Sequence, residues 1–407
     1  MVLGICFLLG FLFFPQLAAA APPIGFLDGV GADWRVWGWA LDPDNPHKAI
    51  DVHLYLDGPA GSGQLIAVLQ ASRPREDVNR VTGFPEDHGF EWHLPSQYRR
   101  GFHQLYAYGI DYGGKEINPH LSTSPRPFGV RAYKYRSMLY LDNGPIRVGV
   151  NLAMGGAVSE ILFQGLSLVN SFDVGREIQT AFYDGNQKYE DFAAAGAGQY
   201  GWNPVQGGDR HNHPSPVLNY YLGPDSIYIK TRSLEWKPDD KGGGPYQPVW
   251  GDLAVEQWLS FWPDDNQIVK LRYKITHLGT DSHGYHLQEL PAIYLNPEFN
   301  RLVYESGRGT TVDRLPQPWE ANRDIYTPEY WAGLVNASDT GLTVFAPGHM
   351  PYVNGVQFND GPAGFPTQNF RPLVKFKLGP KEMVKKEVYL IPGNYERARQ
   401  KIHQYLK

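Results

Sequence analysis

The stretch Gln267-Ile-Val-Lys-Leu-Arg-Tyr-Lys-Ile-Thr-His277 decides the fold class, because apolar and polar residues alternate along it as they do in a half-buried β-strand. Stretches with similar strand character recur through the last two thirds of the chain, separated by loops rich in Gly and Pro. Only residues 395–405, which follow Asn394 as a helix cap, have a helical pattern. We therefore predict an all-β protein. The other strand candidates are residues 146–152, 157–163, 227–232, 253–262, 341–346 and 387–391.

Two regions of the chain differ in their strand pattern. Residues 24–128 contain short strands at intervals of about ten residues, each bounded by turn residues, which predicts a small accessory β-sandwich. Residues 132–407 have longer strands and no repeat of fixed period, which predicts one large domain of two packed sheets. In the first region, Trp37 and Trp39 would share a strand face. They could bind a glycan, although core packing is the better explanation for them.

The N-terminal residues 1–21 have the pattern of a signal peptide. An apolar run is followed by Pro15 and four alanines, but the usual basic start is missing, so a retained anchor stays an alternative. Cys6, the only cysteine, lies in this segment, so the mature chain would have no disulfide. We expect a secreted or periplasmic protein that has no membrane segment after cleavage.

The composition narrows the choice of partner. A formal net charge of −5 leaves no basic stripe for nucleic acid. The 11 Trp, 25 Tyr and 20 Phe residues could stack on the apolar faces of sugars, although β-sheet cores also use such residues. We find no serine-hydrolase elbow and no phosphate-cradling loop. We therefore predict a carbohydrate partner and no cofactor, and we leave the oligomeric state open.

Several motifs resemble one known superfamily. The order of Asn151-Leu-Ala-Met-Gly-Gly-Ala-Val-Ser-Glu-Ile-Leu162, Leu168-Val-Asn170 and Asp173-Val-Gly-Arg-Glu-Ile-Gln179 resembles the opening of galactose mutarotase-like domains. Tyr273-Lys-Ile-Thr-His277 and residues 284–294 look like the segment where that superfamily places a central histidine or acid. The resemblance implies a β-supersandwich over the last two thirds of the chain. It also implies a sugar-binding concave sheet, which epimerases, polysaccharide lyases and glycoside hydrolases of this superfamily share.

Arg176 is the first candidate site residue, since the resemblance implies that it faces the sugar. Its guanidinium could donate to sugar hydroxyls or to a uronate carboxylate. The alternative is a local ion pair with Asp173 or Glu177. We also predict Tyr183 and Asp184 as catalytic residues and Gln179 as a substrate-binding residue, although strand alternation would prevent all of them from facing one cleft.

The loop of residues 201–214 is unusually rich in polar and aromatic side chains within a Gly/Pro frame. We predict that it contributes to substrate binding. Alternate residues at its end could hold a metal ion, but no further strong ligand is visible in the sequence, so we predict a site without metal. The substrate-binding candidates in this loop are Trp202, Asn203, Gln206, Asp209, His211 and His213.

His286 and Glu289 are the candidate acid–base pair. A histidine titrates near neutrality, and burial among apolar neighbours would raise the pKa of the Glu289 carboxyl. Residues three apart on a strand point to opposite faces, so the pair would require a bulge near Gln288. We take Tyr294 and Trp331 as further cleft aromatics, with ordinary core packing as the alternative.

These residues predict a secreted enzyme that cleaves a polysaccharide or oligosaccharide, with hydrolysis favoured. Glu289 with Asp184 or Asp209 could supply the two carboxylates of a glycoside hydrolase. The alternatives are a polysaccharide lyase acting through Arg176, Tyr183 and His286, then an aldose epimerase, then a glycan-binding protein without catalysis.

Overall fold

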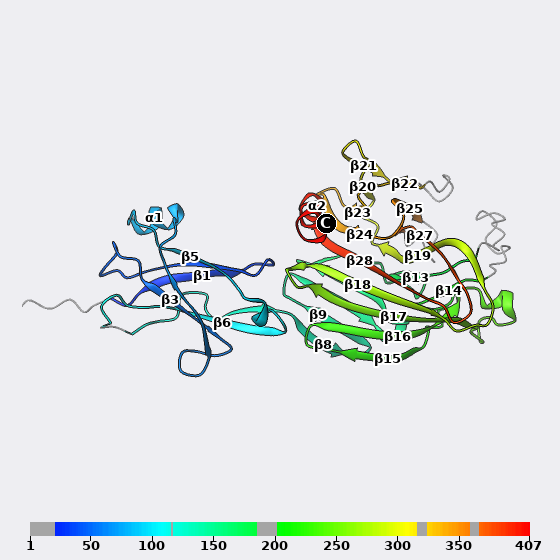
Figure 1. Ribbon diagram of the computed structural model, residues 1–407, viewed down its shortest axis with the longest axis horizontal. Helices are drawn as coiled ribbons and strands as arrows, with labels where there is room; N and C mark the ends of the chain where they lie inside the picture. The colour runs from blue at the N-terminus through cyan, green and yellow to red at the C-terminus, as the bar shows by residue number, and fades with distance from the viewer. Residues whose placement is uncertain (1–20, 115–116, 185–201, 316–323, 359–365) are drawn as a thin grey trace, which may run out of the picture. The chain divides into compact units, whose positions relative to one another are not determined.

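The computed structural model describes residues 21–114, 117–184, 202–315, 324–358 and 366–407. The predicted signal peptide therefore lies almost wholly outside the described residues. The prediction of an all-β protein is confirmed, since antiparallel sheets dominate the described chain (Figure 1). No helix in the described part of the chain is long and apolar enough to cross a membrane. The chain forms two compact units. The smaller unit comprises Met1–Val30, Arg35–His93 and Gln104–Pro127, and the larger one comprises Gly31–Trp34, Leu94–His103 and Phe128–Lys407.

Two small sheets form the framework of the smaller unit. The three-stranded sheet has the order β1 (Ile24–Val30), β2 (Arg35–Leu41), β5 (Gly89–His93), and the four-stranded sheet has the order β4 (Gln64–Gln70), β3 (Asp51–Leu56), β6 (Phe102–Gly109), β7 (Arg126–Gly129). Buried and more exposed residues alternate along β2 and β3. Trp37 and Trp39 are half-buried on one face of β2, and Trp39 stacks on Phe26 with ring centroids 5.7 Å apart. Among its described residues this unit has one helix, α1 (Glu76–Thr82). The short 3₁₀ turn η1 (Ser96–Tyr98) belongs to the Leu94–His103 segment of the larger unit.

The first of two large sheets in the larger unit is called here the β17 sheet. Its strands pair antiparallel, and Figure 1 shows β16, β17 and β18 side by side. In order across the sheet they are β15 (Val217–Leu222), β16 (Ser226–Glu235), β17 (Trp250–Trp262), β18 (Asp265–His277), β28 (Met383–Asn394), β24 (Thr340–Phe345), β23 (Trp331–Val335), β20 (Arg301–Glu305) and β21 (Thr310–Arg314).

The second large sheet is called here the β19 sheet, after its longest strand. Its strands also pair antiparallel. In order they are β8 (Arg131–Tyr135), β9 (Met138–Asp142), β10 (Ile146–Asn151), β11 (Ala157–Phe163), β13 (Ile178–Ala181), β19 (His283–Leu295), β26 (Thr367–Pro372), β25 (Tyr352–Phe358) and β22 (Ile325–Tyr326). Three short strands complete the pairings: β12 (Leu166–Ser167) on β11, β27 (Val374–Leu378) on β19, and β14 (Pro204–Val205), which pairs with both β13 and β16 and so joins the two sheets. Two 3₁₀ turns, η2 (Leu152–Met154) and η3 (Pro238–Lys241), lie between strands.

One large apolar core includes residues from both sheets of the larger unit. Ile178 and Ile293 enter it from the β19 sheet, and Val255, Leu271 and Val388 enter it from the β17 sheet; all five are fully or almost fully buried. Strand alternation accounts for this, since every second side chain of each strand points to the same face. The opposite face of the β19 sheet is therefore left for polar residues.

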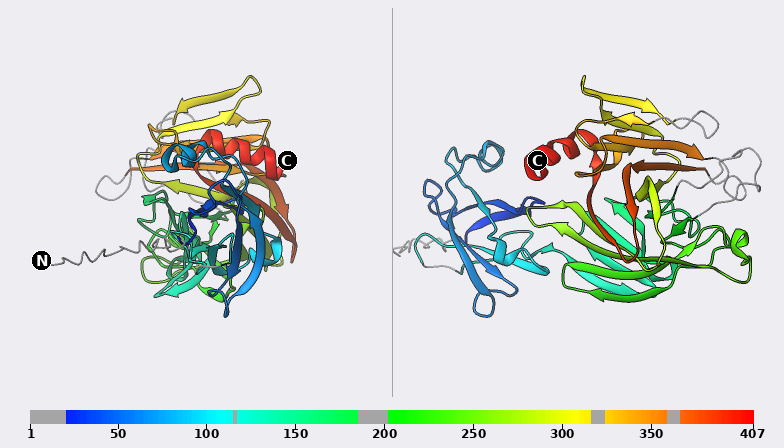
Figure 2. Two further views of the ribbon diagram at one scale, coloured as in Figure 1. Left: turned by 90° about the vertical axis from the view of Figure 1, so that its left-hand side faces the viewer. Right: turned by 45° about the vertical axis from the view of Figure 1, so that its right-hand side comes forward.

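A second, smaller core lies on the other face of the β17 sheet. There α2 (Tyr395–Lys401) and the π-helical turn η4 (Ile402–Leu406) cover β24 and β28, as Figure 2 shows with α2 in red. The side chain of Asn394 caps α2 by accepting from the backbone N–H groups of Glu396 and Arg397. Trp331, a predicted cleft aromatic, is fully buried in this second core, and its Nε1 donates to Glu329 over 2.9 Å.

Leu271 on β18 provides a test of the main core. We expect Leu271→Ala to lower the free energy of unfolding by about 2 to 5 kcal/mol, because the leucine is fully buried and its loss leaves a cavity. The matched control is Leu218→Ala on β15, where the leucine is 52% exposed and the change should stay within about 0.5 kcal/mol. Urea unfolding measures both. Equal losses in the two variants would contradict this account of the core.

Candidate functional site

The outer face of the β19 sheet carries a continuous set of polar side chains. Ile293 and Leu295 of β19 point into the main core, so Tyr294 between them points outward. Tyr294 is the register partner of Asn369 on β26, and Arg371 two residues further is the partner of Asn354 on β25. We call this set of residues the polar face: Gln179, Glu289, Tyr294, Asn354, Asn369 and Arg371.

A chain of polar contacts runs across the polar face. Arg371 Nη1 lies 3.3 Å from Glu289 Oε1, and Arg371 Nη2 donates to Asn354 Oδ1 over 3.0 Å. Asn354 Nδ2 in turn donates to Asp324 Oδ1 over 3.3 Å. The side chains of Arg371 and Glu289 keep 16% and 14% of their surface exposed, so a ligand can still reach this fixed cation and carboxylate. The Nδ2 of Asn369 is buried and has no hydrogen-bond partner among the described residues.

Arg176 forms an ion pair with Asp173, which is the local alternative considered from the sequence. Its Nη1 contacts Asp173 Oδ2, while Asp173 Oδ1 accepts from the backbone N–H groups of Gly175 and Arg176, each over 3.0 Å. The guanidinium also lies over the ring of Phe172, 5.3 Å from its centroid. Its Nε is buried and has no partner in the described structure, so one donor of Arg176 stays unused.

Tyr294 lies within electrostatic reach of both ion pairs. Burial raises the pKa of the Tyr294 phenol above its ordinary value, the charge of Glu289 adds to this, and Arg371 and Arg176 oppose it. The strand order β13–β19–β26 places the Arg371 strand on one side of Tyr294 and the segment that leads into β13 on the other. Glu289 and Asp173 are therefore two carboxylates that both act on this one phenol.

The amide residues predicted to bind substrate instead hold the backbone of their own loop. Gln179 Nε2 donates to the carbonyls of Val174 and Arg176, and Asn203 Nδ2 donates to the carbonyl of Phe182 over 2.9 Å. Gln206 Nε2 donates to Gln257 Oε1 over 3.2 Å. All three predicted amides are almost fully buried, so their hydrogen bonds anchor the 202–215 segment to β13 and its neighbours.

The three charged or titratable candidates of this loop, Asp209, His211 and His213, do not form one group. Asp209 Oδ2 lies 2.8 Å from His213 Nδ1, whereas His211 Nε2 lies 2.8 Å from Asp239 Oδ2. The two imidazole rings lie 6.4 Å apart. This arrangement forms two carboxylate–histidine pairs.

His286 and Glu289 lie in different strand pairings of β19. His286 is the partner of Phe376 on β27, and its Nδ1 lies 3.1 Å from the carbonyl of Leu287, whereas Glu289 contacts Arg371 of β26. Gln288, between them, forms two hydrogen bonds with the backbone of Tyr183, one to its N–H and one to its carbonyl. Tyr183 thus connects to β19 through its backbone.

A second cluster, which the sequence did not predict, surrounds Trp202 and Asp184. It consists of Asp252 at the start of β17, His277 at the end of β18, His283 at the start of β19, and Asp281 in the turn between the two histidines. His277 Nε2 and His283 Nε2 lie 3.0 and 3.2 Å from Asp252 Oδ2. The Trp202 ring stacks on the His283 ring at 3.6 Å, and its Nε1 donates to Asp252 Oδ1 over 2.7 Å.

The charges of this cluster support one another. Although burial opposes both shifts, hydrogen bonds from His283, Trp202 and His277 hold the pKa of Asp252 well below its usual range, and Asp252 raises the pKa of His283. A sequence signal for the cluster did exist. In an antiparallel hairpin the start of one strand lies beside the end of the next, which brings Asp252 at the start of β17 near His277 at the end of β18. Leu253, the residue after Asp252, is indeed the partner of His277.

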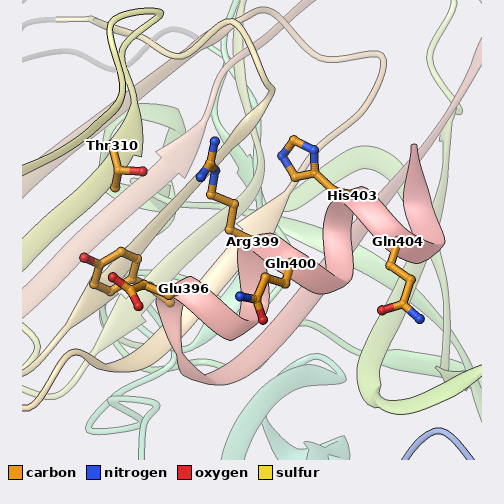
Figure 3. A pocket seen from close by; sticks show the side chains of 7 residues that line it. Thr310, Glu396, Arg399, Gln400, His403 and Gln404 are labelled. Atoms are coloured by element: carbon orange, nitrogen blue, oxygen red, sulfur yellow. The ribbon is translucent and has the colours of Figure 1, made fainter.

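A separate pocket lies along α2, as Figure 3 shows, and contains none of the predicted site residues. Arg399 and His403 in its wall are already paired, with Glu305 over 3.5 Å and with Glu329 over 2.9 Å. The residues that line it are Thr310, Tyr395, Glu396, Arg399, Gln400, His403 and Gln404.

Comparison with known proteins assigns no family to the chain. No protein-family model and no curated protein matches it. Solved structures similar in part include a TPR-domain containing protein from Parabacteroides distasonis (TM-score 0.37, 13% identity, 71% of this chain and 50% of that one). A second is a 4-alpha-glucanotransferase from Thermococcus litoralis (TM-score 0.35, 10% identity, 64% of this chain and 39% of that one). A third is a mutant of the heparan sulfate lyase HepC from Pedobacter heparinus (TM-score 0.34, 8% identity, 65% of this chain and 36% of that one). The chain spans half or less of the length of each of these proteins.

The buried carboxyl group of Glu177, beside Arg176, should make the folding stability of the protein depend on pH. Its carboxylate is fully buried without a hydrogen-bond partner among the described residues, and burial, with a smaller contribution from Asp173, raises its pKa well above the ordinary value. The folded state therefore holds a proton that the unfolded state releases as the pH rises. Folding stability should decrease above the unfolded pKa of about 4.3, by about 1.4 kcal/mol for each pKa unit of difference, until the folded pKa is passed.

We expect Glu177→Gln to remove this contribution. The variant and the parent protein should be similar in stability near the unfolded pKa, and the variant should become the more stable of the two as the pH rises. Free energies of unfolding measured in urea over this pH range test the expectation. The exposed Glu298 provides the control, since Glu298→Gln should show no such trend. A stability difference for Glu177→Gln that stays constant with pH would contradict the assignment.

Proposed function

We propose that the larger unit binds a polysaccharide or oligosaccharide on the polar face and cleaves it by hydrolysis. The observation that supports the proposal is the Glu289 carboxylate, held by Arg371 on the polar face, with a second arginine-held carboxylate, Asp173, in the segment that leads into the neighbouring strand β13. Glycoside hydrolysis requires two carboxyl groups beside the scissile bond, one as acid and one as base or nucleophile. The two segments that resemble galactose mutarotase-like domains, residues 151–179 and 273–294, contain Gln179, Glu289 and Tyr294 of this face.

The other groups of the polar face suit sugar binding. The Tyr294 phenol is protonated at neutral pH, as an ordinary tyrosine is, and burial raises its pKa further, so it can donate a hydrogen bond to a sugar oxygen. Arg371 holds Glu289 in place from the neighbouring strand.

Elimination is the second candidate reaction, and the two arginines favour it. A lyase must neutralise the carboxylate of a uronate before the adjacent proton is removed, and Arg176 and Arg371 are cations fixed by ion pairs in the segment leading into β13 and on β26, on the two sides of β19. The epimerase and non-catalytic alternatives share the same binding surface. A polymeric substrate agrees with the expectation of a secreted or periplasmic protein.

The reaction can be tested with purified protein and a panel of neutral and uronate polysaccharides. We expect new reducing ends without ultraviolet absorbance from an unsaturated sugar. Glu289→Gln and Asp173→Asn should each lower kcat by about 10² to 10⁴-fold, because each removes a proton-transferring or nucleophilic carboxylate. The matched control is Glu256→Gln, which removes a carboxylate that is paired with Lys274 over 2.7 Å on the β17 sheet. This control should keep full activity.

The products distinguish the candidate reactions. Release of an unsaturated uronide would show that the reaction is elimination and not hydrolysis. Interconversion of anomers without chain cleavage would indicate an epimerase. Tight glycan binding without any product would indicate a glycan-binding protein without catalytic activity. Unchanged kcat in both Glu289→Gln and Asp173→Asn would remove these two residues from the reaction.

A further inference from the structure

The cluster around Trp202 has the geometry of a metal site. Asp252, His277, Asp281 and His283 each offer one ligand atom, and these four atoms lie within 4.8 Å of one another. The Nε2 atoms of the two histidines lie 3.0 and 3.2 Å from Asp252 Oδ2, and 3.4 and 3.8 Å from the Asp281 oxygens. Ligands at zinc distances on the corners of a tetrahedron lie about 3.3 Å apart. The four histidine–carboxylate spacings, 3.0 to 3.8 Å, lie on both sides of this value.

The second ring nitrogen of each histidine determines which nitrogen can bind a metal. His277 Nδ1 lies 2.8 Å from the carbonyl of Gly379, and because a carbonyl only accepts, this nitrogen carries the proton. In the neutral ring the lone pair is then on Nε2, which faces the two carboxylates. His283 has the same arrangement, with Nδ1 facing Asp184 Oδ2 at 3.6 Å and Nε2 facing Asp252. Metal-binding histidines in proteins are oriented by partners of this kind.

Trp202 fixes two of the four ligands at once. Its Nε1 binds Asp252 Oδ1, which leaves Oδ2 directed toward the histidines, and its ring stacks on His283 with an angle of 13° between the planes. His277 is fully buried, His283 is nearly so, and Asp281 is 66% exposed. The cluster is therefore rigid on three sides and open to solvent at Asp281.

Gly279 keeps the space between the ligands open. A Cβ atom on this residue would lie 2.5 Å from His277 Nε2, 2.5 Å from Asp281 Oδ1 and 3.1 Å from Asp252 Oδ2. Any other residue would place carbon against three of the ligand atoms. The absence of a side chain at position 279 is thus a second feature, separate from the ligands, that fits an ion between them.

We propose that Asp252, His277, Asp281 and His283 bind one divalent transition-metal ion of the zinc class. Two imidazole nitrogens and two carboxylate oxygens suit Zn²⁺, whereas Mg²⁺ and Ca²⁺ prefer oxygen ligands alone. Four protein ligands define a structural site. The ion connects the start of β17, the end of β18 and the start of β19, and it holds Trp202 over the three strands. The proposal does not depend on the reaction proposed for the polar face.

Zinc binding by the full chain tests the proposal without any activity assay. The protein is stripped with a chelator, dialysed, and titrated with Zn²⁺ in competition with a chromophoric chelator, and its melting temperature is recorded with and without the ion. We expect one zinc per chain and a melting temperature that rises with zinc, because an ion that binds only the folded state stabilises it. A protein that binds no zinc under these conditions would overturn the proposal, since the cluster would then be an ion-pair network.

Two variants locate the site. Asp281→Asn removes one ligand at an exposed position, and Gly279→Ala keeps all four ligands but crowds them; each should weaken zinc binding by at least about tenfold. The matched control is Asp264→Asn, an exposed carboxylate paired with Arg99 over 3.3 Å, which should bind zinc as the parent does. Circular dichroism verifies that each variant is folded. Unchanged zinc affinity in both Asp281→Asn and Gly279→Ala, or its loss in His213→Gln instead, would overturn the assignment.

Discussion

The alternation of side chains along β19 fixes the core and the polar face together. Its apolar residues Ile293 and Leu295 are fully buried in the main core, so Tyr294 between them points outward. A register shift in the pairing with β13, where Ala292 is the partner of Gln179 and Glu289 that of Ala181, brings Glu289 to the same face. A shift of one residue in the pairing with β13 or β26 would place Tyr294 in the core and Ile293 in the solvent-facing layer. Burial of one face, together with this register shift, therefore determines which polar groups meet on the other and places Glu289 beside Arg371.

Strand β19 also connects the polar face with the histidine cluster, which consists of Asp252, His277, Asp281 and His283. His283 is its first residue, and Glu289 follows about 20 Å further along an extended chain. A sugar chain extending along the face could lie near both, but the groups that hold each cluster come from different neighbours. The polar face depends on β13, β25 and β26, whereas the histidine cluster depends on the β17–β18 hairpin and on the carbonyl of Gly379.

The all-β fold could be predicted from alternation alone, because that pattern is a local property of the sequence. The contacts of the site could not. Glu289 and Arg371 lie on strands far apart in the sequence, and their meeting depends on a register that no local pattern specifies. Asp173 was visible as a partner for Arg176 because the two are three residues apart. Asn203 and Gln206 looked like ligand-binding residues, since a polar side chain that anchors a loop and one that binds a sugar have the same sequence pattern.

The stacking of Trp202 on His283 has an optical consequence. A histidine ring in face-to-face contact with an indole quenches its emission, most strongly when the imidazole is protonated, so the fluorescence of this one tryptophan depends on the state of the ring 3.6 Å away. The same indole is hydrogen-bonded through Nε1 to a carboxylate, which couples its emission to the local field as well. Among the eleven tryptophans of the chain, Trp202 is thus positioned as a built-in spectroscopic probe of the histidine cluster.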